Sequence, residues 1–226
     1  MLPGPGEKAH YVAAMFGRIA ARYDLMNTLM TLGQDARWRR VLADALPRTG
    51  LVLDLGTGTG RLAQAIADRD PRVRLVAADF TLRMLQVAPA ELRRVAADAQ
   101  QLPFRDGQFE AVASGFLVRN LADIDRGLRE QMRVLKSGGT LAILETTPGP
   151  TGPLRHLYRL YFRSIVPLIG AVVAGDASAY TYLPESTLAF LEPSRLAAEL
   201  RAHGFQAVRT VPLMLGCVAV TVATKR

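Results

Sequence analysis

A short apolar run that ends in glycines is the most restrictive feature of this sequence. Residues 51–55 read Leu-Val-Leu-Asp-Leu, and Gly56-Thr57-Gly58-Thr59-Gly60 follows at once. An apolar run of this length before a glycine-rich turn is typical of a buried parallel strand that leads into a helix. Because small residues let the backbone approach a ligand closely, we expect a binding site at the carboxyl end of this strand.

Strand and helix patterns alternate after this run, which predicts an α/β fold with a Rossmann-like, doubly wound sheet. Strands are expected at 51–55, 73–78, 93–96, 109–114 and 140–145, and helices at about 60–67, 81–87 and 122–135. A strand pair at 205–212 and 216–224 is expected to close the sheet.

Helical periodicity flanks the core on both sides. Stretches 9–22, 24–32 and 34–46 precede it, and stretches 154–173 and 193–203 follow a proline- and glycine-rich break. We therefore expect one domain over residues 1–226. Its parts are a helical cap (1–50), a cofactor-binding core (51–147), an inserted helical substrate segment (148–204) and closing strands (205–226).

The composition excludes several classes of protein. Half of the 226 residues are hydrophobic and 21% are charged, which argues against a disordered chain. A single cysteine excludes a disulfide framework, and scattered His10, His156 and His203 predict no metal site. The N-terminus lacks the layout of a signal peptide, and no apolar run is long enough to span a bilayer. These features favour a reducing, cytoplasmic setting.

The formal net charge of +8 would attract either nucleic acid or an anionic membrane surface. Nearly all basic residues are arginine, a bias that genome composition alone can produce. The chain lacks an aromatic and basic ribonucleoprotein motif, so nucleic-acid binding is not expected.

Carboxylates follow three of the expected strands and point to a nucleoside ligand. Asp54, near the end of the first strand, can order the glycine loop or meet a cationic group. Asp79 follows the next strand, about twenty residues beyond the glycines, where a carboxylate can accept both ribose hydroxyls. Asp98 follows the third strand, where it can meet an adenine amino group. The loop is not a dinucleotide fingerprint, because Arg61 stands one position after Gly60.

Taken together, these motifs resemble class I S-adenosylmethionine-dependent methyltransferases. The matching segments are 52–60, 78–79, 98–104 and 133–139. The resemblance implies S-adenosylmethionine as cofactor. It would be held by Asp54, Gly56, Gly58, Thr59, Asp79, Asp98, Ala99 and Ser114.

A narrower resemblance comes from outside the cofactor motifs. Tyr23-Asp24-Leu25-Met26-Asn27 and Val118-Arg119-Asn120-Leu121 are similar to the ubiquinone/menaquinone biosynthesis C-methyltransferase family, and the similarity runs from about Lys8 to the end of the chain. The chain departs from the family pattern at Asp98, where relatives commonly have Asn. It departs also at Gly115, where relatives usually have Ser, so Ser114 stands one position early.

The resemblance implies transfer of a methyl group to a ring carbon of a reduced polyprenyl quinone, and demethylmenaquinol is the favoured acceptor. We expect Arg119 and Asn120 to orient the donor's surroundings and the quinol oxygen, and Tyr23 to close the site. Tyr158 and Tyr161, with Ile165 and Leu168, could line a passage for the prenyl tail.

Simpler interpretations stay open for each catalytic residue. Arg119 could form a surface salt bridge, Asn120 could cap the helix after it, and Tyr23 could be a core aromatic. The acceptor could be a ubiquinone precursor or another amphiphile, or the chain could bind the cofactor without turnover. The general base, ring type, tail length and oligomeric state are not determined.

The expected partners are the lipophilic quinol and a transient membrane surface, which the stretch 154–173 would contact. A homodimer is a further expectation. The protein would then be cytoplasmic, or peripheral at the inner face of the membrane.

Overall fold

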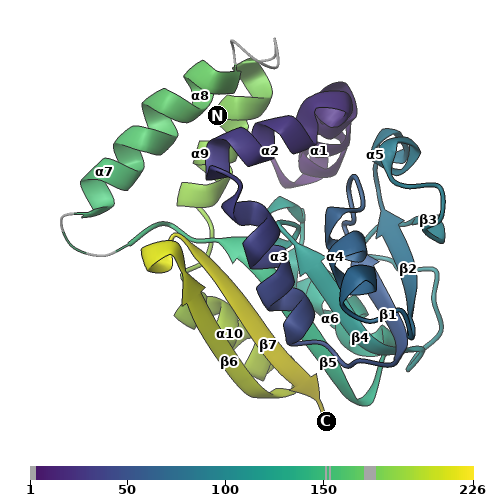
Figure 1. Cartoon of the computed structure of the whole chain (residues 1–226). Coiled ribbons are helices and arrows are strands. Elements are labelled where there is room, and N and C mark those ends of the chain that lie inside the picture. The colour runs from purple at the N-terminus through teal and green to yellow at the C-terminus, as the bar shows by residue number, and fades with distance from the viewer. Residues whose placement is uncertain (1–3, 151, 153, 171–176) are drawn as a thin grey trace.

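The computed structural model describes residues 4–150, 152, 154–170 and 177–226. Its centre is a seven-stranded sheet with the strand order β3-β2-β1-β4-β5-β7-β6 (Figure 1). Strands β1 to β5 are parallel, and β7 runs antiparallel to both β5 and β6. The strands are β1 (Gly50–Leu55), β2 (Val73–Asp79), β3 (Arg94–Ala96), β4 (Phe109–Gly115), β5 (Leu135–Thr146), β6 (Phe205–Leu213) and β7 (Val218–Lys225).

This sheet confirms the predicted Rossmann-like fold. The strand order reverses between β1 and β4, and in open α/β sheets such a switch point is where ligands bind, beyond the carboxyl ends of the strands.

Helices cover both faces and the carboxyl end of the sheet. Figure 1 shows α1, α2, α8 and α9 gathered at that end. The α-helices are α1 (Pro5–Ile19), α2 (Tyr23–Thr31), α3 (Gln34–Asp44), α4 (Arg61–Arg69), α5 (Leu82–Val87), α6 (Ile124–Val134), α7 (Leu154–Leu160), α8 (Val166–Ile169), α9 (Ala177–Leu188) and α10 (Pro193–Ala202). Shorter turns of helix are η1 (Ala20–Arg22), η2 (Val118–Asn120), η3 (Tyr161–Ile165, a π-helix) and η5 (Met214–Gly216).

The core has one layer on each side of the sheet because successive side chains of a strand point to opposite faces. On one side, Leu53 of β1 packs with Leu128 of α6 and Leu200 of α10. On the other, Val52 packs with Leu42 of α3 and Ile66 of α4. Helix α3 therefore belongs to the layer on the sheet, whereas α1 and α2 lie beyond the strand ends. The predicted domain boundaries stay predictions.

Several elements differ from the expectation. The helix expected at 122–135 begins at Ile124, and its N-cap is Asp123, which accepts a hydrogen bond from the Arg126 backbone N–H at 2.9 Å. The suggestion that Asn120 caps this helix is therefore wrong. Helix α9 was not anticipated as an element of its own, because Pro184 lies inside it and interrupts the helical pattern. Residues 171–173 of the expected helix 154–173 lie outside the described residues.

In the part of the chain that the structure describes, no helix has both the length and the apolarity to cross a membrane.

Candidate functional site

The glycine loop after β1 folds as a tight turn at the end of the sheet. Gly56 and Gly58 have φ values of 69° and 57°, a region that costs little only for glycine. A side chain at Gly56 would also collide, since its Cβ atom would lie 2.8 Å from Leu117 Cδ1. Backbone conformation and close packing therefore both require glycine here.

Two carboxylates hold this loop in place. Asp54 is fully buried and accepts a hydrogen bond of 2.6 Å from the Thr57 hydroxyl. Asp79, at the end of β2, accepts from the backbone N–H groups of Gly58 at 2.8 Å and Thr81 at 2.7 Å. Burial raises the pKa of both carboxyls, that of Asp54 to about 6, although their hydrogen bonds act in the opposite direction.

A partly open cavity lies beside this loop. Its floor is the glycine loop and the ends of β2 and β4, and helix α1 covers it through Ala9, Val12 and Phe16. The predicted cofactor residues on its wall are Gly56, Gly58, Asp79, Asp98 and Ala99, and their contact with the cofactor stays a prediction.

The donor and acceptor groups of this cavity fit an adenosyl group. The oxygens of Asp79 keep lone pairs that can accept from two ribose hydroxyls. Asp98 Oδ1 accepts from the Gln100 backbone N–H at 2.8 Å, while no described residue donates to its Oδ2. An adenine amino group can therefore donate to that oxygen.

The other predicted cofactor residues lie away from this cavity. Asp54 and Ser114 are fully buried in the sheet, and neither is part of the wall. The Thr59 hydroxyl donates to Asp24 Oδ1 at 2.7 Å, and Arg61 pairs with the same carboxylate at 3.0 Å. Thr59 thus ties the glycine loop to α2, and Asp54 orders the loop from below.

The raised pKa of Asp54 predicts an unusual dependence of stability on pH. A carboxyl whose pKa is raised by folding binds its proton more tightly in the folded state and so stabilises the protein at low pH. That stabilising free energy is lost as the pH rises from the unfolded pKa, 3.8, through the folded pKa, about 6. Relative to an Asp54→Asn variant, the wild type is expected to lose about 2 kcal/mol of unfolding free energy between about pH 4 and pH 7. Denaturant unfolding of both proteins at both pH values measures the difference, and parallel pH profiles would contradict it.

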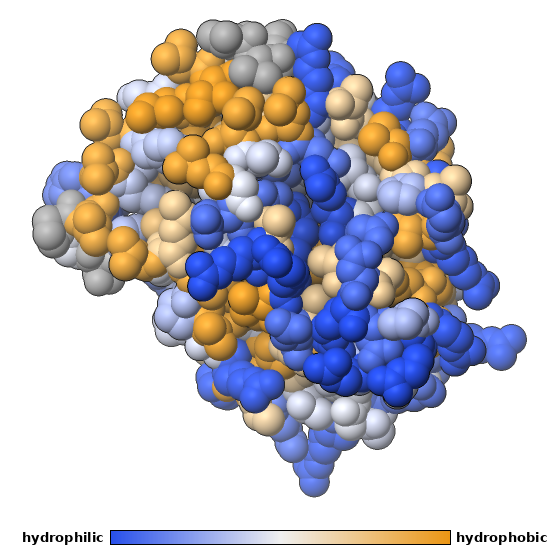
Figure 2. All heavy atoms as spheres, viewed as in Figure 1, coloured by the Kyte–Doolittle hydropathy of each residue, from blue (hydrophilic) through white to orange (hydrophobic). Residues whose placement is uncertain are grey.

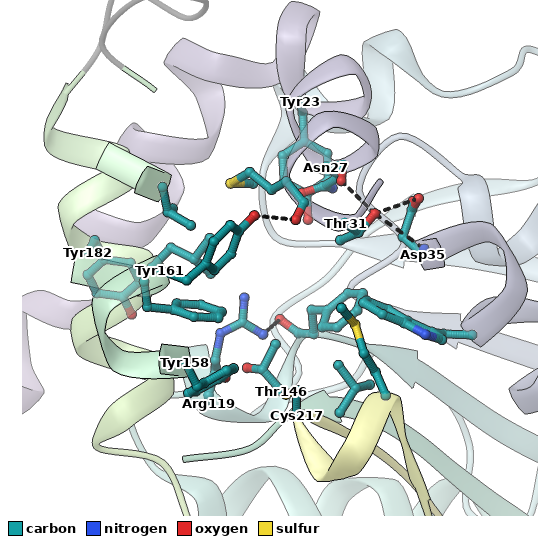
Figure 3. Close-up of a pocket in the computed structure, with 18 of the residues that line it drawn as sticks. Tyr23, Asn27, Thr31, Asp35, Arg119, Thr146, Tyr158, Tyr161, Tyr182 and Cys217 are labelled. Carbon is teal, nitrogen blue, oxygen red and sulfur yellow. Dashed lines mark hydrogen bonds between the residues drawn. The ribbon is translucent and has the colours of Figure 1, made fainter. Parts of the chain in front are cut away.

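A second, partly open cavity adjoins the first. It is lined mainly by apolar and aromatic side chains, with Asn27, Thr31, Asp35, Arg119 and Thr146 also on its wall. Helices α1 and α2, the segments η3 and α8, and the turn before β7 form its walls (Figure 3). Phe16, Tyr23 and Phe116 line both cavities, so the two spaces meet at these three rings. Phe116 has a φ of 60°, a conformation that is rare for a bulky residue and is found mostly at functional sites.

Arg119 brings a buried cation to the wall of the apolar cavity. Its Nη1 donates to Glu145 Oε1 and, at 3.0 Å, to the Phe116 carbonyl, and its side chain is only 5% exposed. Its Nε is buried, and no acceptor among the described residues meets it. The surface salt bridge considered for Arg119 is therefore wrong, because the pair with Glu145 is buried.

Asn120 lies on the wall of the cofactor cavity, while its side-chain partner lines the apolar one. Its Nδ2 donates to the Phe116 carbonyl at 2.9 Å, and its Oδ1 accepts from the Tyr182 hydroxyl at 3.2 Å. Lys8 of α1 donates to the Arg119 and Leu121 carbonyls at 2.9 and 2.7 Å. The segment that carries Arg119 and Asn120 is thus held by β5, α9 and α1.

Helix α2 supplies a second buried donor without an acceptor. Asn27 lines the apolar cavity, and its Nδ2 meets no acceptor in the described part of the chain. Near it, the Thr31 hydroxyl donates to the Asn27 carbonyl at 2.8 Å, and Thr31 also contacts Asp35, whose partner is Arg39. Figure 3 shows Asn27 and Arg119 on different walls of the cavity.

The four residues predicted to line the passage for the prenyl tail do not all face the cavity. Tyr158 and Tyr161 line the cavity, but Ile165 and Leu168 are 45% and 63% exposed and face outwards. The prediction that all four share one lining was therefore wrong for Ile165 and Leu168. Burial raises the pKa of Tyr158, Tyr161 and Tyr182, so these hydroxyls are neutral at physiological pH.

Sequence reasoning missed Glu145, Phe116 and Asn27 as site residues. Glu145 appeared only as the end of an expected strand, which is where ligand-binding residues of α/β sheets gather. Asn27 was part of a recognised motif, but no role was assigned to it.

Comparison with known proteins agrees with this geometry. The model of the ubiE/COQ5 methyltransferase family matches residues 6–225. The chain belongs to this family. A demethylmenaquinone methyltransferase of Deinococcus radiodurans is 45% identical, with 97% of this chain and 95% of the relative covered. A ubiquinone/menaquinone biosynthesis C-methyltransferase UbiE of Desulfotalea psychrophila is 42% identical, with 96% and 89% covered.

Solved structures support the fold alone. A methyltransferase of Thermotoga maritima, described as S-adenosylmethionine-dependent and as a possible histamine N-methyltransferase, superposes with a TM-score of 0.68 at 18% identity, with 94% of this chain and 99% of the other covered. Membership of the ubiE/COQ5 family identifies the chain as an S-adenosylmethionine-dependent methyltransferase.

Proposed function

We propose that this enzyme transfers the methyl group of S-adenosylmethionine to a ring carbon of a lipophilic quinol, with demethylmenaquinol as the favoured acceptor. One observation carries the proposal. An apolar cavity meets the cofactor cavity at Phe16, Tyr23 and Phe116, and its wall includes Arg119 and Asn27, each of which has a buried nitrogen, Nε and Nδ2, that meets no acceptor among the described residues. A quinol has two ring oxygens, which could accept from Arg119 and Asn27. Its ring and tail are apolar and would fill the apolar part of the cavity.

The cofactor supplies an electrophilic methyl group when bound. In this chain Asp79 and Asp98 would hold its adenosyl part, and the glycine loop would place it beneath the three shared rings. Helix α1 closes the cavity from above, which keeps water away from the reacting atoms.

The acceptor needs help because a ring carbon is a poor nucleophile. A quinol that gave up a phenolic proton to water would become a quinolate, whose adjacent ring carbon is the nucleophile for the methyl group that the bound cofactor would supply, with the cofactor's sulfur keeping the bonding pair. The ring hydrogen would leave as a second proton, again to water, and aromaticity would return. Arg119 would stabilise the anionic oxygen in an apolar, water-poor space, where a fixed cation is most effective. Asn27 would hold the second oxygen and so orient the ring.

Asn120 and Tyr23 act at the boundary between the two cavities. The hydrogen bond from Tyr182 and the bond to the Phe116 carbonyl would fix Asn120 beside the donor. Tyr23 packs edge-on against Phe16, with ring centroids 5.7 Å apart, and both rings would press the quinol towards the methyl group.

A methyl-transfer assay tests the function. Chemically reduced demethylmenaquinol and the demethylated ubiquinol precursor are offered separately under anaerobic conditions, and products are identified by mass. We expect ring methylation of the naphthoquinol at a higher kcat/KM than the benzoquinol. Preference for the benzoquinol would assign the chain to the ubiquinone branch. Cofactor binding without methylation of either quinol would contradict the proposal and favour another amphiphile.

A further inference from the structure

Large apolar side chains are exposed around the mouth of the apolar cavity. Figure 2 shows hydrophobic residues gathered over α2, α7 and α8. We define the docking face by the exposed apolar residues of these helices, of η3 and of the turn before β7. Its members are Leu25, Leu29, Leu32, Leu154, Leu157, Leu160, Ile165, Leu168, Met214 and Leu215.

Helix α2 has this face on one side and the cavity on the other. Leu25, Leu29 and Leu32 are spaced by four and three residues, so they form one stripe. Asn27 and Met30 of the same helix line the cavity instead. The Tyr161 hydroxyl, on the facing wall, donates to the Met30 carbonyl at 2.5 Å and joins the two walls. Only one layer of helix therefore separates the cavity from the exposed stripe.

The most exposed members of the docking face stand at positions with an unusual backbone conformation. Leu32, Met214 and Leu215 have φ values of 51°, 46° and 55°, which bulky side chains rarely adopt. Leu32 and Leu215 are also 84% and 78% exposed. Thr147 accounts for the fixed shape of the turn, because its backbone N–H donates to the Cys217 carbonyl at 3.0 Å. Exposure of large apolar side chains in one place is typical of a surface that contacts another molecule.

The charges on α7 and η3 are all positive. Arg155, Arg159 and Arg163 are exposed, and they alternate with the leucines of α7 and η3. The stretch 154–169 contains no Asp or Glu. In the described part of the chain, no carboxylate pairs with any of these three arginines. Apolar side chains interleaved with unpaired arginines match the boundary between headgroups and acyl chains of an anionic bilayer.

We propose that the docking face binds the surface of an anionic membrane leaflet, with the mouth of the apolar cavity turned towards the lipid. The proposal rests on the proposed function. Docking would let a quinol dissolved in the bilayer pass into the cavity without crossing water. Met214, which is half exposed and lines the cavity, stands where the face and the cavity meet.

Vesicle sedimentation tests the face directly. The full chain is mixed with vesicles of phosphatidylcholine, alone or with phosphatidylglycerol. The variant Leu32→Ser/Leu168→Ser/Leu215→Ser removes the most prominent apolar groups, and Leu82→Ser on α5, which is 63% exposed, is the matched control. We expect the triple variant to bind at least about tenfold more weakly and Leu82→Ser to bind as the wild type does. An Arg155→Gln/Arg159→Gln variant should lose binding only to vesicles that contain phosphatidylglycerol.

Three results would overturn the proposal. They are equal binding by wild type and triple variant, equal losses in the triple variant and in Leu82→Ser, and a wild-type dimer in size-exclusion chromatography with light scattering that the triple variant dissociates. The last result would assign the face to a second copy of the chain.

Activity separates docking from the chemistry. With a short-tailed quinol in buffer, the triple variant is expected to keep the wild-type kcat/KM. With a long-tailed quinol in vesicles, its rate should fall about tenfold, in step with binding. Equal rates on the vesicle substrate would contradict docking at this face. Absence of methylation by the wild type on either substrate would contradict the proposed function, and the sedimentation result would still decide the docking face.

Discussion

Replacing Arg119 by methionine is expected to lower kcat by a factor of about a hundred to a thousand while the affinity for S-adenosylmethionine changes little. In the proposed reaction a quinolate would carry its charge in the apolar cavity, and Arg119 is a cation on the wall of that cavity. Loss of one preorganised donor at a developing oxyanion has this effect in other enzymes. Single-turnover rates with reduced demethylmenaquinol, together with calorimetric titration of the cofactor, measure the two quantities separately.

Arg39→Met is the matched control. Arg39 is as buried as Arg119, pairs with a buried carboxylate of its own, and also lies over the Phe116 ring, at 5.7 Å against 5.6 Å. Arg39 itself is not on the cavity wall, although its partner Asp35 is. Both substitutions break a buried ion pair and should cost about 3–5 kcal/mol of stability, yet only Arg119→Met should remove turnover. If the variants prove too unstable, Arg119→Lys and Arg39→Lys keep the charge and allow the same comparison. Equal losses of kcat in the two would refute a direct role for Arg119.

Asp79→Asn is expected to weaken the binding of S-adenosylmethionine by about a hundredfold. The carboxylate stands on the wall of the cofactor cavity, and both of its oxygens can accept from ribose hydroxyls in addition to the backbone. The amide keeps one acceptor and replaces the other by a donor, so one charge-assisted hydrogen bond is lost and one hydroxyl is opposed. Calorimetric titration with the cofactor measures the change in Kd.

Asp54→Asn serves as the control for loop order. Asp54 holds Thr57 of the same loop but is absent from the cavity wall, so its variant should bind the cofactor within a few-fold of the wild type. A similar loss in both variants would mean that Asp79 acts only by shaping the loop. A Kd for Asp79→Asn within threefold of the wild type would exclude it as a ribose ligand.

Local sequence pattern was sufficient for the sheet and the glycine loop. The apolar run before Gly56 and the carboxylates after β2 and β3 are features of neighbouring residues, and hydrophobic periodicity reports such features directly. The placement of Asp54 and Ser114 could not be read in this way. Both stand on strands near the cofactor, but burial within the sheet depends on the helices packed over each face.

The apolar cavity could not be predicted from local sequence, because its lining residues come together only in the tertiary structure. Glu145 meets Arg119 only because β5 and η2 lie side by side in the fold, although 26 residues separate them in sequence. The expected stripe of Tyr158, Tyr161, Ile165 and Leu168 failed for a local reason. The π-helix η3 inserts extra residues into the turn, which rotates Ile165 and Leu168 away from the face that the tyrosines occupy.

Helix α2 has nine residues, and nearly every side of it takes part in a contact described above. Asp24 anchors the glycine loop, Tyr23 and Asn27 line the apolar cavity, Met26 is fully buried, and the leucines face outwards. A change on its inward side would disturb both cavities together, whereas the outward leucines line neither cavity. The turn at Met214–Cys217 touches the apolar cavity and not the cofactor cavity. Variation in acceptor preference can therefore accumulate at this turn while methyl-donor binding is left intact, and engineering of the enzyme for new quinols would begin there.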